Sequence, residues 1–276
     1  MLVGALLVML AVVSTAGAGL ELDLARLRDG ATWRPAVLRA LLANLVVVPA
    51  ATFALVHGAA LPADAANALW LVALAPGGAS APLLARLAGG EPTRVGTVYV
   101  ALCVSSLLAL PLLLPMLSTS ATSIPGPQLL ALCVALQLLP LAVGLVVRAR
   151  REATALRVAG HFRRFGSVLL GVIVLLLLVT RGSFLAALGA PTLLGMLGVV
   201  LVSLAAGALL APGPRLPDAL LACVRNLTLA LLIAEGSRPG GHTTLIIAAY
   251  GLVMYVAAAA CLRLFAVKSP LAQEVP

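Results

Sequence analysis

The segment Ala219–Glu235 is a membrane-length apolar run that carries an arginine and an amide, Arg225 and Asn226, at its centre. A charge at the middle of a bilayer costs roughly 2.5–3.5 kcal/mol on insertion scales. A chain that keeps a charge at this depth is expected to turn it into the protein interior or a cavity. The segment therefore predicts a bundle of membrane helices with a polar interior.

The composition extends this prediction to the whole chain. Of the 276 residues, 62% are hydrophobic and 10% are charged. Apolar runs of about 18 residues or more are typical of transmembrane helices. They are continuous, whereas a transmembrane β-barrel needs alternating apolar and polar residues. We therefore predict an all-α polytopic membrane protein. Aromatic residues make up only 4% of the chain, so the net charge of +9 does not indicate a nucleic-acid-binding surface.

The apolar runs predict nine membrane spans in two repeats. The uncharged, Ser/Thr/Pro-rich loop 118–127 divides the first repeat, 1–117, from the second, 128–268. The spans are expected near residues 1–20, 35–57, 66–88, 95–117, 128–147, 166–180, 185–210, 217–235 and 242–266.

The basic residues predict the orientation of these spans. Fifteen of the 18 lysines and arginines follow odd-numbered spans, two follow even-numbered spans, and Arg225 lies inside a span. The densest group is a predicted loop between Arg148 and Arg164. Since basic loops stay in the cytoplasm, we expect the N-terminus outside and the C-terminus in the cytoplasm of a cell inner membrane.

Two of the spans are predicted to be broken helices. The run Leu74–Leu83 contains two prolines and two glycines, which remove a helix hydrogen bond and loosen the backbone. The second break is expected near Arg225–Asn226. Interrupted helices in corresponding positions of two halves indicate the substrate site of a transporter. We therefore expect the breaks near 76–82 and 225–226 to cross at mid-membrane.

Polar side chains near these breaks are candidates for binding substrate or ions. The polar candidates are Asn44, Ser80, Tyr99, Arg225, Asn226 and Thr228. Each has a structural alternative: Asn44 or Thr228 would bond a neighbouring helix, Tyr99 would pack in the core, and Arg225 would tether half-helix carbonyls.

Motifs for catalysis or metal binding are missing from the sequence. It has no HExxH, P-loop or GxGxxG pattern. The stretch from Gly78 begins like a nucleophile elbow but ends in Pro82. The four cysteines form no CxxC pair, so they are interpreted as small buried hydrophobes. We predict neither an enzyme nor a catalytic, metal or cofactor site.

At the two breaks the chain resembles the bile acid:sodium symporter family. The similar segments are Ala75–Gly90 and Leu221–Ala234, together with Ala18–Leu24, Arg34–Pro35 and the amide Asn44 five residues before Pro49. The resemblance implies a nine-helix bacterial member with inverted repeats, a panel domain, and a core domain in which two discontinuous helices cross.

The same resemblance implies that most sodium ligands of the family are replaced. The family's Ser–Asn pair corresponds to Ala81 and Pro82 in this chain. Its two hydroxyl-bearing ligands further along the chain correspond to Val95 and Tyr99. The sodium-binding glutamate falls at Leu221, and the glutamine before Asn226 becomes Arg225. Sodium remains a possible ion, but the replacements favour weak sodium coupling. We hypothesise that Arg225 replaces sodium as a fixed counter-charge, bonding unwound carbonyls or an anionic substrate.

The expected function is secondary active transport of an organic anion by alternating access. Its substrate would be bile-acid-like, pantoate-like or another carboxylate. A sodium-independent exporter or uniporter, and a membrane sensor or scaffold without transport, stay open as alternatives. The expected partners are the small anion and the lipid bilayer, and no nucleic acid.

Overall fold

The computed structural model describes residues 2–22, 34–117, 124–186, 188–238 and 241–265. These residues form helices joined by short turns, with no strand among them. The helices are α1 (Leu2–Glu21), α3 (Arg34–Leu42), α4 (Val48–Gly58), α5 (Ala63–Ala73), α6 (Ala81–Leu87), α7 (Pro92–Leu117), α8 (Gly126–Cys133), α9 (Leu139–Arg150), α10 (Glu152–Ala186), α11 (Ala190–Leu210), α12 (Arg215–Cys223), α13 (Leu227–Ser237) and α14 (His242–Phe265).

Within the described part of the chain, six helical segments are long and apolar enough to cross a membrane. They are Arg34–Gly58, Pro92–Pro115, Gly126–Arg150, Ala190–Leu210, Arg215–Ser237 and His242–Phe265. The predicted all-α polytopic class is therefore confirmed, whereas nine spans and the division into two repeats stay predictions. Arg26, Arg28, Lys268 and most of the loop 118–127 lie outside the described residues.

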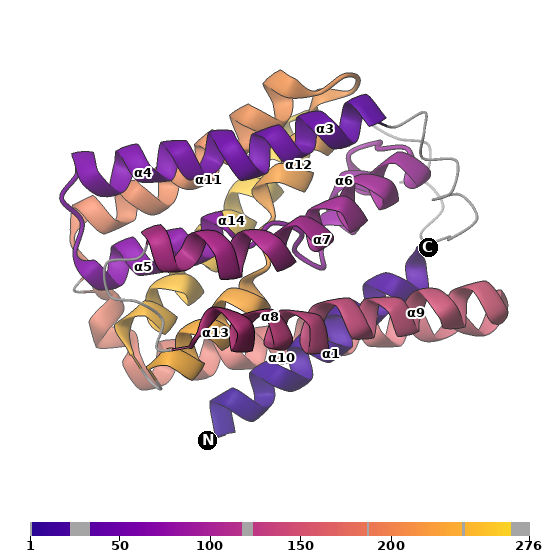
Figure 1. Cartoon of the computed structure of the whole chain (residues 1–276), viewed down its shortest axis with the longest axis horizontal. Helices are drawn as coiled ribbons and strands as arrows, with labels where there is room; N and C mark the ends of the chain where they lie inside the picture. The colour runs from indigo at the N-terminus through magenta and orange to yellow at the C-terminus, as the bar shows by residue number, and fades with distance from the viewer. Residues whose placement is uncertain (1, 23–33, 118–123, 187, 239–240, 266–276) are drawn as a thin grey trace.

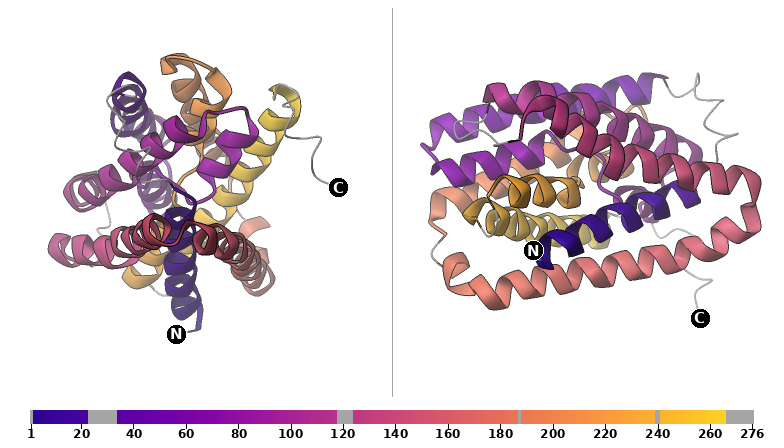
Figure 2. Two further views of the ribbon diagram at one scale, coloured as in Figure 1. Left: turned by 90° about the vertical axis from the view of Figure 1, so that its right-hand side faces the viewer. Right: turned by 60° about the horizontal axis from the view of Figure 1, so that its bottom comes forward.

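The helices run side by side in two groups (Figures 1 and 2). In the first, α1 packs against α9 and α10. Gly19 and Gly144 bring α1 and α9 close together, because a Cβ on either would lie 2.4 Å from a carbonyl oxygen of the other helix. In the second, α11 packs against α12, α4 and α14, and both broken helices belong here. We call these groups the panel (α1, α8–α10) and the core (α3–α7, α11–α14).

Two spans contain a wide π-helical turn just before a proline. The turn η2 (Ala43–Val47) precedes Pro49, and η3 (Val134–Leu138) precedes Pro140. Proline has no N–H, and its ring clashes with the carbonyl four residues earlier, so a wider turn keeps the helix continuous. Each wide turn carries a buried amide, Asn44 in η2 and Gln137 in η3.

The predicted basic loop between Arg148 and Arg164 is wrong. α9 runs to Arg150 and α10 begins at Glu152, so most of this segment is helical. Ala155 and Ala159 are buried against Leu20 of α1. Burying this apolar stripe, while Arg150, Arg151, Arg157 and Arg164 stay exposed, stabilises a helix where charge density suggested a loop.

Candidate functional site

The two broken helices cross and bond each other through their backbones. The first break separates α5 from α6, and the second, residues 224–226, separates α12 from α13. The backbone N–H of Gly78 donates to the Val224 carbonyl at 3.1 Å, and the backbone N–H of Asn226 donates to the Ala75 carbonyl at 2.7 Å. Backbone groups that leave a helix within a membrane need new partners, and here each break supplies them to the other. The predicted contact between the two breaks is confirmed, whereas their position at mid-membrane stays a prediction.

Glycines make this approach possible. Gly77 has a φ of +81°, in the left-handed region that L side chains rarely adopt. At Gly78, a Cβ would lie 2.4 Å from the Arg225 carbonyl oxygen and 3.0 Å from the Val224 side chain. The Pro-Gly-Gly sequence therefore provides both the turn and the space for the second broken helix.

The second break contains neither proline nor glycine and is held by hydrogen bonds. Asn226 has φ −77° and ψ 77°, close to an inverse γ-turn, and the Leu227 amide donates to the Arg225 carbonyl at 2.9 Å. The Asn226 side chain then caps α13 by accepting from the Leu229 amide at 3.1 Å. The side chain of Asn226 thus caps a new helix that begins directly after the break.

Arg225 extends from this break into the interior of the core. Its side chain is 1% exposed. Nη1 donates to Oδ1 of Asn44 at 2.7 Å, and Nη2 donates to Oγ of Ser203 on α11 at 3.0 Å. Both partners are uncharged side chains rather than the unwound carbonyls named as one option in the sequence hypothesis. The guanidinium therefore joins three parts of the core, and neither of these two partners is a carboxylate.

A cavity of about 110 Å³ lies between panel and core, beside the crossing. The break residues Ser80, Arg225 and Asn226 line it together with residues of α1, α10 and Tyr255 on α14. The Ser80 hydroxyl lies 2.9 Å from the Tyr255 hydroxyl. The cavity wall thus comes from both helix groups, so a relative movement of the groups would change its access.

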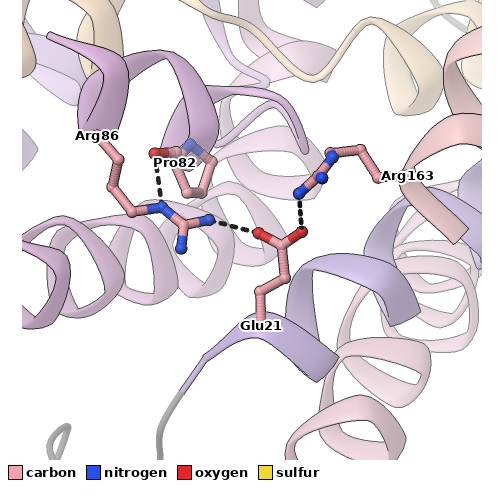
Figure 3. Close-up of polar contacts among 4 residues, drawn as sticks. All are labelled: Glu21, Pro82, Arg86 and Arg163. Carbon is pink, nitrogen blue, oxygen red and sulfur yellow. Dashed lines mark hydrogen bonds and ion pairs between the residues drawn. The ribbon is translucent and has the colours of Figure 1, made fainter. Parts of the chain in front are cut away.

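The charged side chains around the cavity are mostly positive. Arg86, Arg163 and Arg225 line it together with one acidic residue, Glu21, and the guanidinium of Arg225 is turned away toward Asn44 and Ser203 in the core. Glu21 is the last residue of α1 and pairs with Arg86 on α6 and Arg163 on α10 (Figure 3). The excess of guanidinium groups favours an anion in this cavity.

The structure brings most of the predicted site residues to this cavity. Ser80, Pro82, Arg225, Asn226 and Thr228 line it. Asn44 takes part through Arg225, and Ala81 is buried at the start of α6. Tyr99 is also buried, beside Cys103, and is not among the described lining residues. This position agrees with the packing alternative for Tyr99.

Sequence reasoning missed Glu21, Ser203 and Tyr255 and treated Arg86 and Arg163 only as flanking charges. An acid at the end of an apolar span was a signal for Glu21. No local signal distinguished Ser203 or Tyr255, because their partners are distant in sequence. Among the described residues there is no group of three or more His, Cys, Asp or Glu side chains placed to hold a metal ion.

The comparisons with known proteins point to one family. A family model described as "Sodium Bile acid symporter family" matches residues 6–206, more than half of the chain. The matched region contains α1, the first broken helix, the arginines at 86 and 163, and most of α11. No curated protein matches the chain.

Proposed function

Because this chain belongs to the sodium bile acid symporter family, we propose that it is a secondary transporter that moves an organic anion by alternating access. The observation that carries the proposal is the charge of the cavity between panel and core. The guanidinium groups of Arg86 and Arg163 outnumber the carboxylate of Glu21 at its wall, and arginine binds carboxylates through a planar fork of N–H donors.

The start of α13 adds to this attraction. The N-terminus of a helix carries about half a positive charge, and Asn226, Leu227 and Thr228 at the start of α13 line the cavity. An anion there would meet this helix end, with the buried Arg225 two residues before it in the chain. A neutral or cationic substrate would gain nothing from either group.

The cavity volume favours a small carboxylate over a steroid in this conformation. Pockets for drug-sized ligands enclose roughly 300–1,000 Å³, whereas this cavity encloses about 110 Å³. A pantoate-sized acid is therefore a better first substrate to test than a bile acid.

Arg225 favours transport without sodium coupling. The family description names sodium, but here a permanent cation occupies the centre of the core and bonds Asn44 and Ser203. A sodium ion close to this guanidinium would be repelled, and the oxygens of Asn44 and Ser203 already accept from it. We infer that Arg225 supplies the fixed positive charge of the site in every state of the cycle.

Uptake into proteoliposomes tests the proposal. Purified protein should accumulate labelled pantoate but not its uncharged amide, equally with a sodium and a potassium gradient. Arg225→Gln should reduce uptake at least tenfold while the protein stays folded. A steep increase with sodium alone would refute sodium independence, and a lack of uptake across a panel of small and steroidal carboxylates would favour a sensor or scaffold.

A further inference from the structure

The carboxylate of Glu21 is held between two arginines from different helix groups. Oε1 accepts from Nη1 of Arg163 at 2.7 Å, and Oε2 accepts from Nη2 of Arg86 (Figure 3). Nε of Arg86 also donates to the Pro82 carbonyl at 3.3 Å, which fixes the arginine against its own helix. Glu21 and Arg163 belong to the panel, whereas Arg86 belongs to the core, so the ion pair bridges the two groups.

In the cluster of Glu21, Arg86 and Arg163, the arginine side chains are more exposed than the carboxylate. The side chain of Glu21 is 16% exposed, against 33% for Arg86 and 47% for Arg163. All three residues line the cavity. One carboxylate shared by two guanidinium groups leaves the cluster with a net positive charge, and each guanidinium has five N–H donors.

We propose that Arg86 and Arg163 form an anion subsite for the substrate carboxylate, and that Glu21 fills this subsite in the described conformation. The proposal rests on the proposed transport of an organic anion and adds where its carboxylate binds. Glu21 acts as a tethered competitor, which the substrate displaces from the arginines.

Displacement explains how the bridge between panel and core can open. If core and panel separate while Glu21 still pairs with Arg86, a partly buried ion pair must break without replacement, which is costly. A substrate carboxylate that takes the place of Glu21 keeps Arg86 paired. Binding of the anion and release of the bridge are then the same event.

A variant without the tethered carboxylate tests this subsite. Glu21→Gln keeps the shape of the side chain and removes its charge. Pantoate binding is measured by thermal shift and calorimetry on purified protein in lipid nanodiscs. If Glu21 fills the subsite about nine-tenths of the time, its removal should tighten the apparent Kd about tenfold. The uncharged amide of pantoate should show no such gain.

Asp218→Asn is the matched control. Asp218 on α12 pairs with Arg94 on α7, and Arg94 is not among the described residues that line the cavity. This variant also removes one carboxylate from an arginine-bound pair, so it changes the net charge equally. It should leave pantoate affinity within about twofold, an energy difference well below the 1.4 kcal/mol of a tenfold change.

A second set of variants keeps the test decisive if Glu21→Gln folds poorly. Glu21→Asp retains the charge but shortens its reach, and it should give a smaller gain in affinity. Arg86→Gln should weaken pantoate binding at least tenfold, and Glu21→Gln should then bring no gain in the Arg86→Gln background. Unchanged pantoate affinity in both Glu21 variants would overturn the subsite.

These measurements distinguish a failure of the proposed subsite from a failure of the proposed transport. If wild-type protein takes up pantoate but the Glu21 and Arg86 variants bind it like wild type, the subsite is wrong and the transport proposal stands. If the variants shift pantoate affinity as expected but no carboxylate is taken up, the subsite stands and transport is wrong.

Discussion

Arg225 is a buried cation held by oriented dipoles rather than by a carboxylate. The Asn44 side chain donates through Nδ2 to the Ala40 carbonyl at 2.8 Å, so its other atom, Oδ1, faces Arg225. Ser203 donates its own hydroxyl hydrogen to the Val199 carbonyl and accepts from Arg225. Both partners are thus fixed as acceptors, which suits a permanent positive charge.

Replacing Asn44 by alanine should therefore destabilise the protein by about 1.5–3 kcal/mol, the contribution of a hydrogen bond to a charged group. The guanidinium stays buried in the variant and loses one of its acceptors. The measurement is the unfolding midpoint in detergent micelles. Thr52→Val is the control, because this buried hydroxyl on the same span donates to the Val48 carbonyl of its own helix. Equal losses for both variants would contradict a special role for Asn44.

At the scale of the helices, the crossing depends on backbone contact. Two hydrogen bonds join the breaks directly. α7 supports the first break from the other side, where the Cys103 thiol lies 3.7 Å from the Gly77 carbonyl. The break is therefore enclosed by backbone on one side and by α7 on the other, and it has little space for an added side chain.

Gly78→Ala should disrupt this crossing. The new methyl group would meet the Arg225 carbonyl at 2.4 Å, so the backbones must separate. Overpacking of this kind costs about 1–3 kcal/mol, and the displaced Arg225 should also lower pantoate uptake. Folded yield and uptake are measured together.

The control is Gly160→Ala on α10, where nothing lies within 4 Å of an added Cβ. There alanine should stabilise the helix by about 0.5–1 kcal/mol. If Gly78→Ala folds and transports like Gly160→Ala, the close approach of the breaks does not matter for transport.

For the whole molecule, polar contacts link panel and core at two described places. One is the Glu21–Arg86 pair. The other is Gln137 of η3, which donates to the Cys103 carbonyl at 3.2 Å and to the Ser106 hydroxyl at 3.1 Å on α7. These contacts place a charged bridge beside the cavity and an uncharged one between η3 and α7.

The end of the molecule that carries the α9–α10 turn should face the cytoplasm. A cysteine in place of the exposed Arg157 should resist a membrane-impermeant thiol reagent in intact cells. The turn from α4 to α5 lies at the other end of the molecule (Figure 1). A cysteine in place of the exposed Ala59, which directly follows α4, should react. The background should lack Cys261, which is partly exposed, whereas the other three cysteines are buried. The reverse labelling pattern would overturn the orientation.

The sequence by itself determined the membrane class and the places where two helices break. Both depend on local properties: the length of apolar runs, proline without an N–H, glycine without a side chain, and an arginine that lipid cannot solvate. It also identified Asn44, Ser80, Arg225, Asn226 and Thr228 as polar groups near the breaks, because few polar residues interrupt these runs.

The tertiary structure alone decided which of these groups meet and what they bond. Arg225 and Asn44 are 181 residues apart, and Glu21 and Arg163 are 142 apart. Spacing along the chain carries no information about such pairs, because helix packing sets their distance. The helical start of α10 was decided in the same way, through burial of Ala155 and Ala159 on α1. Local charge density alone could not predict that contact.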